Sequence, residues 1–177
     1  EVSAIAEPED RQLPLNLCLI LDHSGSMKGT PLNTVKQAAK ELIKGLKPED
    51  RLSVVAFDHQ AEVIVPCQQV TDPNDIFARI DKLQAAGGTA IDAGIKLGIT
   101  QLIEGKQDRV SHAFILTDGE NEHGDNERCI KLAGFATESN ITLNTLGFGE
   151  NWNQNILEKI ADTAAGTLAY IEEAAQD

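Results

Sequence analysis

Residues 17–30 read LCLILDHSGSMKGT, so that five apolar residues run straight into an acid and two hydroxyl side chains at alternate positions. Five apolar residues without alternation indicate a strand covered on both faces, as in parallel sheets flanked by helices. The polar end of such a strand emerges at the carboxyl edge of the sheet, where open α/β sheets bind ligands. Asp22, Ser24 and Ser26 offer only oxygen, which hard cations such as Mg²⁺ prefer. The stretch therefore predicts an α/β fold and outlines a metal site.

Two distant segments complete this outline. Taken alone, Asp22, Ser24 and Ser26 fit a turn with a helix cap as well as they fit a metal site, because Asp and Ser are common in turns and at helix N-caps. Gly87 and Gly88 precede Thr89 and an apolar-periodic helix, and residues 115–119 form another apolar strand that ends in Asp118 and a glycine. If the two strands are parallel neighbours, both acids lie on one rim of the sheet, and the glycine loop can bring Thr89 to the same spot.

In this order the three parts resemble the metal-ion-dependent adhesion site of the von Willebrand factor A family, which includes the integrin inserted domains. The resemblance covers residues 16–171, and residues 22–27 are more similar to the bacterial branch of the family than to the animal adhesion branch. It implies a complete site, in which the motif residues share the metal. Ser24 and Ser26 would bind the ion directly, and Asp22 would hold a coordinated water. Thr89 and Asp118 would exchange direct and water-mediated roles as a ligand comes and goes.

The resemblance also implies a function, divalent-metal-dependent binding of a protein partner. The cation would be Mg²⁺, with Mn²⁺ or Ca²⁺ as substitutes, and its open sixth position would attract an Asp or Glu carboxylate of the partner. Residues beside the motif are candidate rim or ligand contacts, namely His23, Met27, Gly88, Gly119 and Glu120. We expect His23 to point away from the cation, because the ligands occupy the alternate positions around it.

Composition fits one globular domain and excludes two classes of partner. The chain has 177 residues, 41% of them hydrophobic, with a lead-in at residues 1–14, the domain at 15–173 and a tail at 174–177. The net charge of −13 argues against electrostatic binding of nucleic acid or anionic lipid. No apolar run approaches the roughly 18 residues of a membrane span, so we expect no direct membrane insertion.

The three cysteines, Cys18, Cys67 and Cys129, form no close pair and do not indicate a disulfide framework. Their placement favours a reducing, cytoplasmic compartment, although one disulfide plus a free thiol stays open. Because the chain starts at Glu1 and shows no leader pattern, we expect it to be part of a larger polypeptide or complex.

Hydrophobic periodicity predicts strands that alternate with helices. Thr30 and Pro31 are predicted as the N-cap and the first residue of a helix, and residues 61–65 alternate as an antiparallel edge strand should. The pattern predicts a Rossmann-like, doubly wound, mostly parallel sheet of about six strands, with helices on both faces. The remaining elements are strands at 52–57, 113–117, 141–147 and 167–171, and helices starting near 73, 90, 126 and 153.

Motifs of other functions fail in detail. No Gly-Lys pair completes a phosphate loop, Trp152 stands where a dinucleotide fingerprint needs its third glycine, and Ser24 replaces the second acid of an aspartyl phosphotransferase. The acidic run at 118–125 has His123 and Cys129 where a calcium loop needs Gly and Glu, which leaves a solvated loop or a secondary cation contact.

We therefore expect a binding module and not an enzyme. Two alternatives stay open. One is a metal-assisted hydrolase, which would need a base that the sequence does not clearly supply. The other is a subunit of a chelatase-type or ATPase-type assembly, which residues outside this chain would decide.

Overall fold

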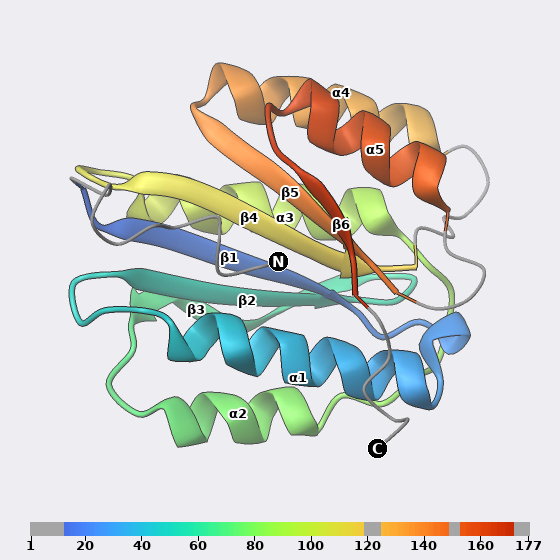
Figure 1. Cartoon of the computed structure of the whole chain (residues 1–177), viewed down its shortest axis with the longest axis horizontal. Coiled ribbons are helices and arrows are strands. Elements are labelled where there is room, and N and C mark those ends of the chain that lie inside the picture. Colours follow the sequence, from blue (N-terminus) through green and yellow to red (C-terminus); the bar gives the residue numbers. More distant parts are fainter. Residues whose placement is uncertain (1–12, 119–124, 149–152, 172–177) are drawn as a thin grey trace.

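The computed structural model describes residues 13–118, 125–148 and 153–171, which build one six-stranded sheet (Figure 1). Its strand order is β3-β2-β1-β4-β5-β6, and every neighbouring pair is parallel except β2 and β3. The predicted sheet with one antiparallel edge strand is confirmed. The strands are β1 (Leu15–Asp22), β2 (Arg51–Phe57), β3 (Ala61–Gln69), β4 (Val110–Thr117), β5 (Ile141–Gly147) and β6 (Leu168–Tyr170).

Helices cover both faces of this sheet, and the apolar residues of β1 point alternately into the two cores between the sheet and the helices. Leu17, Leu19 and Leu21 join one cluster with the first two helices, and Cys18 and Ile20 join another with the remaining three. This explains why β1 shows no polar alternation. The first two helices are α1 (Thr30–Lys44) and α2 (Pro73–Asp81), and the others are α3 (Ile91–Gly105), α4 (Asp125–Glu138) and α5 (Gln154–Thr163).

The order of the strands creates a switch point between β1 and β4. The chain leaves β1 for β2 on one side, and later returns to place β4 on the other side. In open α/β sheets, ligands bind outside the carboxyl ends of the strands at such a point. Asp22 ends β1, and Asp118 directly follows β4.

Helix α3 lies unusually close to the sheet at its glycines. A Cβ atom on Gly94 would lie 2.7 Å from Cδ2 of Phe57, and one on Gly98 would lie 2.6 Å from Cδ1 of Ile20. Because neither glycine carries a Cβ atom, the helix can pack this closely against β1 and β2.

Several boundaries differ from the prediction. Gly29, with φ of 86°, is the N-cap of α1, so Thr30 and Pro31 are its first and second residues. The edge strand β3 continues past Val65 to Gln69, since an edge strand tolerates Pro66 without losing a necessary donor. Most of the predicted lead-in and tail lies outside the described residues.

Two expectations from composition can also be compared with the structure. Cys18, Cys67 and Cys129 are free thiols. Within the described ranges, no helix is both long and apolar enough to cross a membrane.

Candidate metal centre

Asp22 lies at the end of β1 with its side chain completely buried. Both carboxylate oxygens accept hydrogen bonds: Oδ1 from the backbone N–H of Ser24 at 2.8 Å, and Oδ2 from the hydroxyl of Thr117 at 2.6 Å. The carboxylate is therefore held in one orientation by its own loop and by the neighbouring strand.

Ser24 and Ser26 lie together in the loop that follows. Their hydroxyl oxygens are 3.1 Å apart, with Ser24 buried and Ser26 exposed. A short 3₁₀ turn, Gly25–Met27, produces this proximity, because it folds the chain back directly after Ser24.

Asp118 follows the adjacent parallel strand and is only 6% exposed. Its backbone carbonyl accepts a hydrogen bond from the N–H of Asn153 at 2.6 Å, and the carbonyl of Thr117 accepts one from Phe148 at 3.2 Å. These bonds attach the end of β4 to the segments around β5 and α5. The predicted meeting of the two strands that carry Asp22 and Asp118 is confirmed.

The loop that carries Thr89 is docked onto the serine loop through the backbone. Ala86 donates to the carbonyl of His23, and Gly25 donates to the carbonyl of Gly87, both at 3.0 Å. Thr89 itself is 8% exposed, and Gly88 lies beside it in the chain. The structure thus joins the Thr89 loop to the serine loop, as the sequence predicted.

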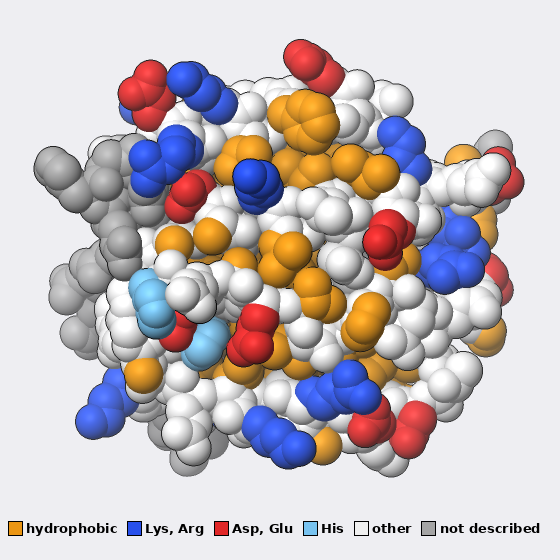
Figure 2. All heavy atoms as spheres, turned by 180° about the vertical axis from the view of Figure 1, so that it is seen from behind, with side chains coloured by type: hydrophobic (Ala, Val, Ile, Leu, Met, Phe, Trp, Pro, Cys, Tyr) orange, Lys and Arg blue, Asp and Glu red, His pale blue; other side chains and the backbone are white. Residues whose placement is uncertain are grey.

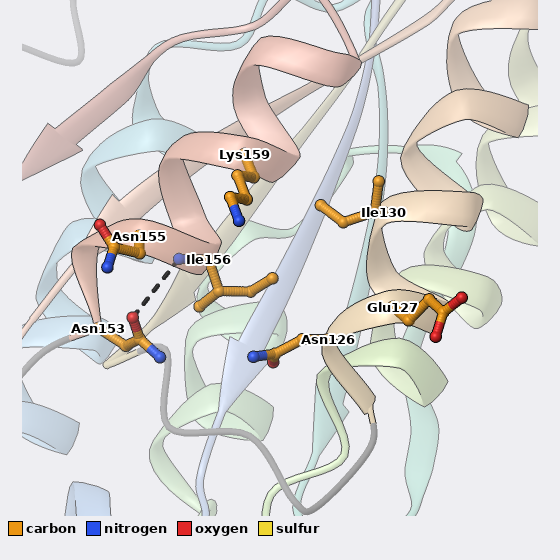
Figure 3. Close-up of a pocket in the computed structure, with 7 residues that line it drawn as sticks. All are labelled: Asn126, Glu127, Ile130, Asn153, Asn155, Ile156 and Lys159. Carbon is orange, nitrogen blue, oxygen red and sulfur yellow. Dashed lines mark hydrogen bonds between the residues drawn. The ribbon is translucent and has the colours of Figure 1, made fainter.

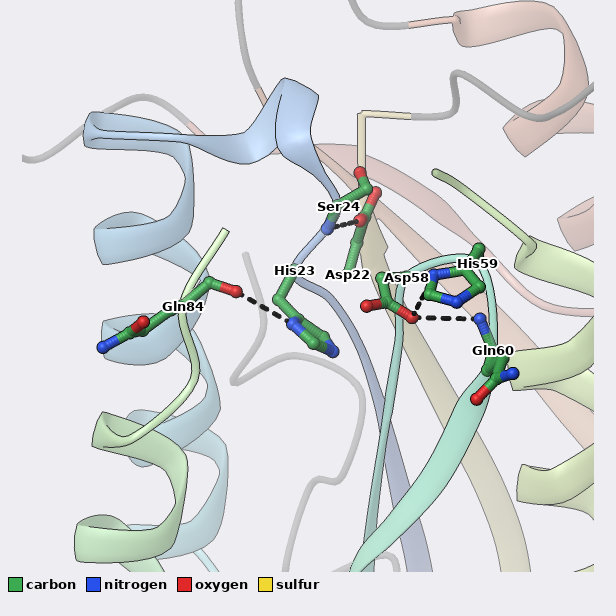
Figure 4. A network of polar contacts seen from close by, with 7 residues as sticks. All are labelled: Asp22, His23, Ser24, Asp58, His59, Gln60 and Gln84. Atoms are coloured by element: carbon green, nitrogen blue, oxygen red, sulfur yellow. Dashed lines mark hydrogen bonds and ion pairs between the residues drawn. The ribbon is translucent and has the colours of Figure 1, made fainter. Parts of the chain in front are cut away.

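Gly87 permits this docking. Its φ of 83° favours glycine, and a Cβ atom there would lie 3.1 Å both from Oδ2 of Asp58 and from Nδ1 of His59. Asp58 is fixed in turn, because its Oδ1 accepts a hydrogen bond from the N–H of Gln60 and lies 3.3 Å from His59 (Figure 4).

The residues beside the motif have different positions. Nδ1 of His23 contacts the carbonyl of Gln84 at 3.0 Å, and its ring points away from Ser24 (Figure 4). Met27 was a candidate rim contact, but it is fully buried in the core between the sheet and helices α1 and α2, because the 3₁₀ turn directs it inward. Gly119 and Glu120 lie outside the described residues.

Thr117 is a site residue that the sequence reasoning missed. Its hydroxyl on β4 donates a hydrogen bond to Asp22 on the neighbouring strand β1, although the two residues are 95 positions apart in the sequence. A polar residue at the end of an otherwise apolar strand, directly before Asp118, was the available signal.

The surroundings of Asp22 disfavour the ionised form of its carboxyl group. The pKa of the Asp22 carboxyl is raised to about 6, chiefly by burial and also by the charge of Asp118, and the hydrogen bonds from Ser24 and Thr117 oppose this rise only in part. Among the described residues, no Lys or Arg forms an ion pair with Asp22. A bound cation would supply the missing positive charge.

The donor set fits a hard divalent cation. Two carboxylates and three hydroxyls offer oxygen only, which suits Mg²⁺ or Mn²⁺. No group of three or more His, Cys, Asp or Glu side chains gathers within the described ranges, so hydroxyls would have to supply part of the coordination.

Sequence comparison identifies the family. Residues 16–177 match the von Willebrand factor type A domain, and the chain belongs to this family. Its domains generally mediate interactions between proteins.

Three similar proteins illustrate the relationship. "Uncharacterized protein sll0103" of Synechocystis sp. is 59% identical over 97% of this chain and 41% of its own length. "Uncharacterized protein YfbK" of Escherichia coli is 30% identical over 93% of this chain and 30% of its own. A von Willebrand factor type A structure from Catenulispora acidiphila superposes with a TM-score of 0.80 at 26% identity, covering 93% of this chain and 40% of that one. The chain thus spans less than half of each relative.

Proposed function

We propose that this domain binds a protein partner through a divalent cation, Mg²⁺ in the first place, held by Asp22, Ser24, Ser26, Thr89 and Asp118. The observation that carries the proposal is the buried, doubly hydrogen-bonded carboxylate of Asp22 beside Asp118 at the carboxyl edge of the sheet. A carboxylate in this environment is stabilised by a nearby cation, and the loops around it supply neutral hydroxyl ligands.

Each residue has a distinct role in this proposal. Ser24 and Ser26 bind the ion through their hydroxyls, and Asp22 orients the loop through the N–H of Ser24 while attracting the ion by its charge. Thr89 and Asp118 complete the site from the two other segments. When bound, the cation supplies a Lewis-acidic position that an oxygen ligand can occupy.

The partner contributes an Asp or Glu carboxylate. Neutral hydroxyl ligands leave the cation more of its positive charge than carboxylate ligands would, so an anionic oxygen is attracted most strongly. The net charge of −13 opposes an acidic partner at long range, but charges farther away than about 8 Å are screened at physiological salt.

Binding without turnover agrees best with the polar contacts. His23 is engaged with a backbone carbonyl, and the Ser24 hydroxyl contacts Ser26 instead of an imidazole. These two contacts give Ser24 no imidazole partner, so we favour binding over hydrolysis. We also propose that the domain belongs to the bacterial branch and functions within a longer polypeptide, as its relatives from Synechocystis and Escherichia coli do.

Isothermal calorimetry tests the metal site. The parent protein should bind one Mg²⁺ or Mn²⁺, and Asp22→Ala or Asp118→Ala should abolish the heat of binding. Asp92→Ala is the matched control, because Asp92 lies on α3 and pairs with Arg128. Equal metal affinity in the parent and the Asp22 variant would refute the assignment.

The partner is tested next. A partner captured with Mg²⁺ and lost in EDTA should contain one acidic residue whose change to the amide removes binding as completely as EDTA does. Metal-dependent binding by every amide variant would contradict the carboxylate bridge.

A further inference from the structure

A cavity of about 350 Å³ opens between the first turns of α4 and α5 (Figure 3). Its volume is at the lower end of the range for small-ligand sites. Both helices begin at the carboxyl edge of the sheet, where Asp22 and Asp118 also lie. The cavity is lined by Asn126, Glu127, Ile130, Asn153, Asn155, Ile156 and Lys159.

The cavity is connected directly to the candidate metal centre. Asn153 lines the cavity, and its backbone N–H donates to the carbonyl of Asp118 at 2.6 Å. The side chain of Asn153 also accepts a hydrogen bond from the N–H of Ile156 at 3.4 Å, which begins α5 at this point. A peptide that brings a carboxylate to the metal and runs towards α5 would therefore pass close to the cavity.

The lining combines an apolar base with polar walls. Ile156 is buried and Ile130 half-buried, so together they can cover the aliphatic stem of a side chain. Asn126, Asn153 and Asn155 contribute amide groups, which can donate hydrogen bonds to an oxygen at the end of that stem.

Lys159 gives the cavity a positive charge. Figure 3 shows its amino group pointing into the cavity, whereas the carboxylate of Glu127 points away. Among the described residues, no acidic side chain forms an ion pair with Lys159. In a chain with a net charge of −13, a cationic group directed into a cavity is well placed to select an acidic ligand.

We propose that this cavity is a second docking subsite for the same partner, and that it takes a second acidic side chain close to the one that meets the metal. The proposal rests on the proposed function, because the metal-bound carboxylate places the peptide. Lys159 pairs with the second carboxylate, and Ile130 and Ile156 cover its methylene groups. The subsite thus favours ligands with two nearby acids over ligands with one.

Short peptides test this subsite. The probes are capped glycine-rich peptides with one Asp and, one to four residues away on either side, a Glu or its uncharged counterpart Gln. In Mg²⁺, the best Asp/Glu peptide should bind about two- to fivefold more tightly than its Asp/Gln partner, the effect of one ion pair with the exposed amino group of Lys159. Lys159→Gln should erase this preference without changing the affinity for Asp/Gln peptides. Lys96→Gln removes the same charge from the exposed surface of α3 and should preserve the preference.

Nuclear magnetic resonance locates the contact. The side-chain amide signals of Asn126, Asn153 and Asn155 should shift with the Asp/Glu peptide and not with the Asp/Gln peptide. A Glu preference that survives Lys159→Gln, or the absence of any preference, would overturn the subsite while Mg²⁺-dependent binding still supports the proposed function. A preference that depends on Lys159 but is identical in Mg²⁺ and EDTA would support the subsite and overturn the metal-dependent function.

Discussion

The hydrogen bond from Thr117 to Asp22 shows how much a single residue contributes to the site. The hydroxyl lies 2.6 Å from a fully buried carboxylate oxygen, while the N–H of Ser24 satisfies the other oxygen. Hydrogen bonds to a buried charge are stronger than neutral ones, and losing the donor leaves the charge poorly solvated.

Replacing Thr117 with Val should therefore weaken both the fold and metal binding. The change keeps the shape of the side chain but removes the donor, and should cost about 2 kcal/mol of unfolding free energy at pH 7. It should also lower Mg²⁺ affinity by at least about tenfold, as the loss of a group that orients a metal ligand does. Urea unfolding and calorimetry measure the two effects. Thr117→Ser keeps the hydroxyl and should retain most of both, and equal losses in the two variants would contradict the assigned role.

The raised pKa of Asp22 predicts a pH dependence. In the folded protein the pKa of Asp22 is about 6, against 3.8 for an aspartate in an unfolded chain, so the metal-free fold binds the proton more tightly than the unfolded chain does. The resulting stabilisation is complete below pH 3.8 and is lost as pH rises through 6. Because the metal needs the ionised carboxylate, Mg²⁺ affinity should instead fall by up to about tenfold per unit below pH 6.

The variant Asp22→Asn isolates this group. In EDTA, the difference in unfolding free energy between parent and variant should shift against the parent as pH rises from 5 to 7. A constant difference across this interval would show that Asp22 does not titrate there.

At the scale of the elements, the glycines of α3 fix the distance between this helix and the sheet. A Cβ atom on Gly98 would approach two atoms of the buried Ile20 within 2.9 Å, and would meet Sγ of Cys18 at 3.3 Å. Only Ala90 separates Thr89 from the first residue of α3, so the position of Thr89 depends on the same packing.

Gly98→Ala should destabilise the fold by about 1 to 2 kcal/mol, because overpacking costs more than the helix propensity of Ala contributes. Gly134→Ala is the matched control within α4, where nothing lies within 4 Å of the added Cβ atom. That variant should gain up to about 1 kcal/mol. Thermal or urea unfolding compares the two, and a stabilising Gly98→Ala would contradict the close packing.

The elements also show what the sequence could predict and what it could not. Residues 17–22 and 113–118 predicted two buried parallel strands, and their polar ends placed Asp22 and Asp118 correctly. The hydrogen bond of the Thr117 hydroxyl was not predicted, because a contact between side chains of different strands depends on the register of the strands. Met27 was misplaced because a 3₁₀ turn reverses direction within three residues. The cavity at Lys159 depends on how two helices lie side by side, which periodicity alone does not encode.

For the whole molecule, the two cores are complete without a metal. Each face of the sheet has its own cluster of buried apolar side chains, and β1 contributes to both. The cation should therefore act on ligand binding more than on folding.

The surface charge of the molecule is mixed. On the face shown in Figure 2, acidic and basic side chains are interspersed, so the negative net charge forms no single acidic patch there.

Chelation should lower stability only by linkage. At saturating Mg²⁺ the gain for a moderate-affinity site is roughly 1 to 3 kcal/mol, and EDTA should remove it while the far-ultraviolet circular dichroism at room temperature stays the same. Loss of that signal in EDTA would mean that the metal builds the fold, as it does in structural zinc domains.

The central claim is that a cation lies between the three segments and accepts an acid from outside. A crystal grown with Mn²⁺ and acetate, whose carboxylate stands in for the partner's side chain, tests it most directly. The anomalous difference map should show one principal peak within bonding distance of the Ser24 and Ser26 hydroxyls, with an acetate oxygen bound to the ion. A principal peak elsewhere, or no peak at these hydroxyls at saturating Mn²⁺, would contradict the account.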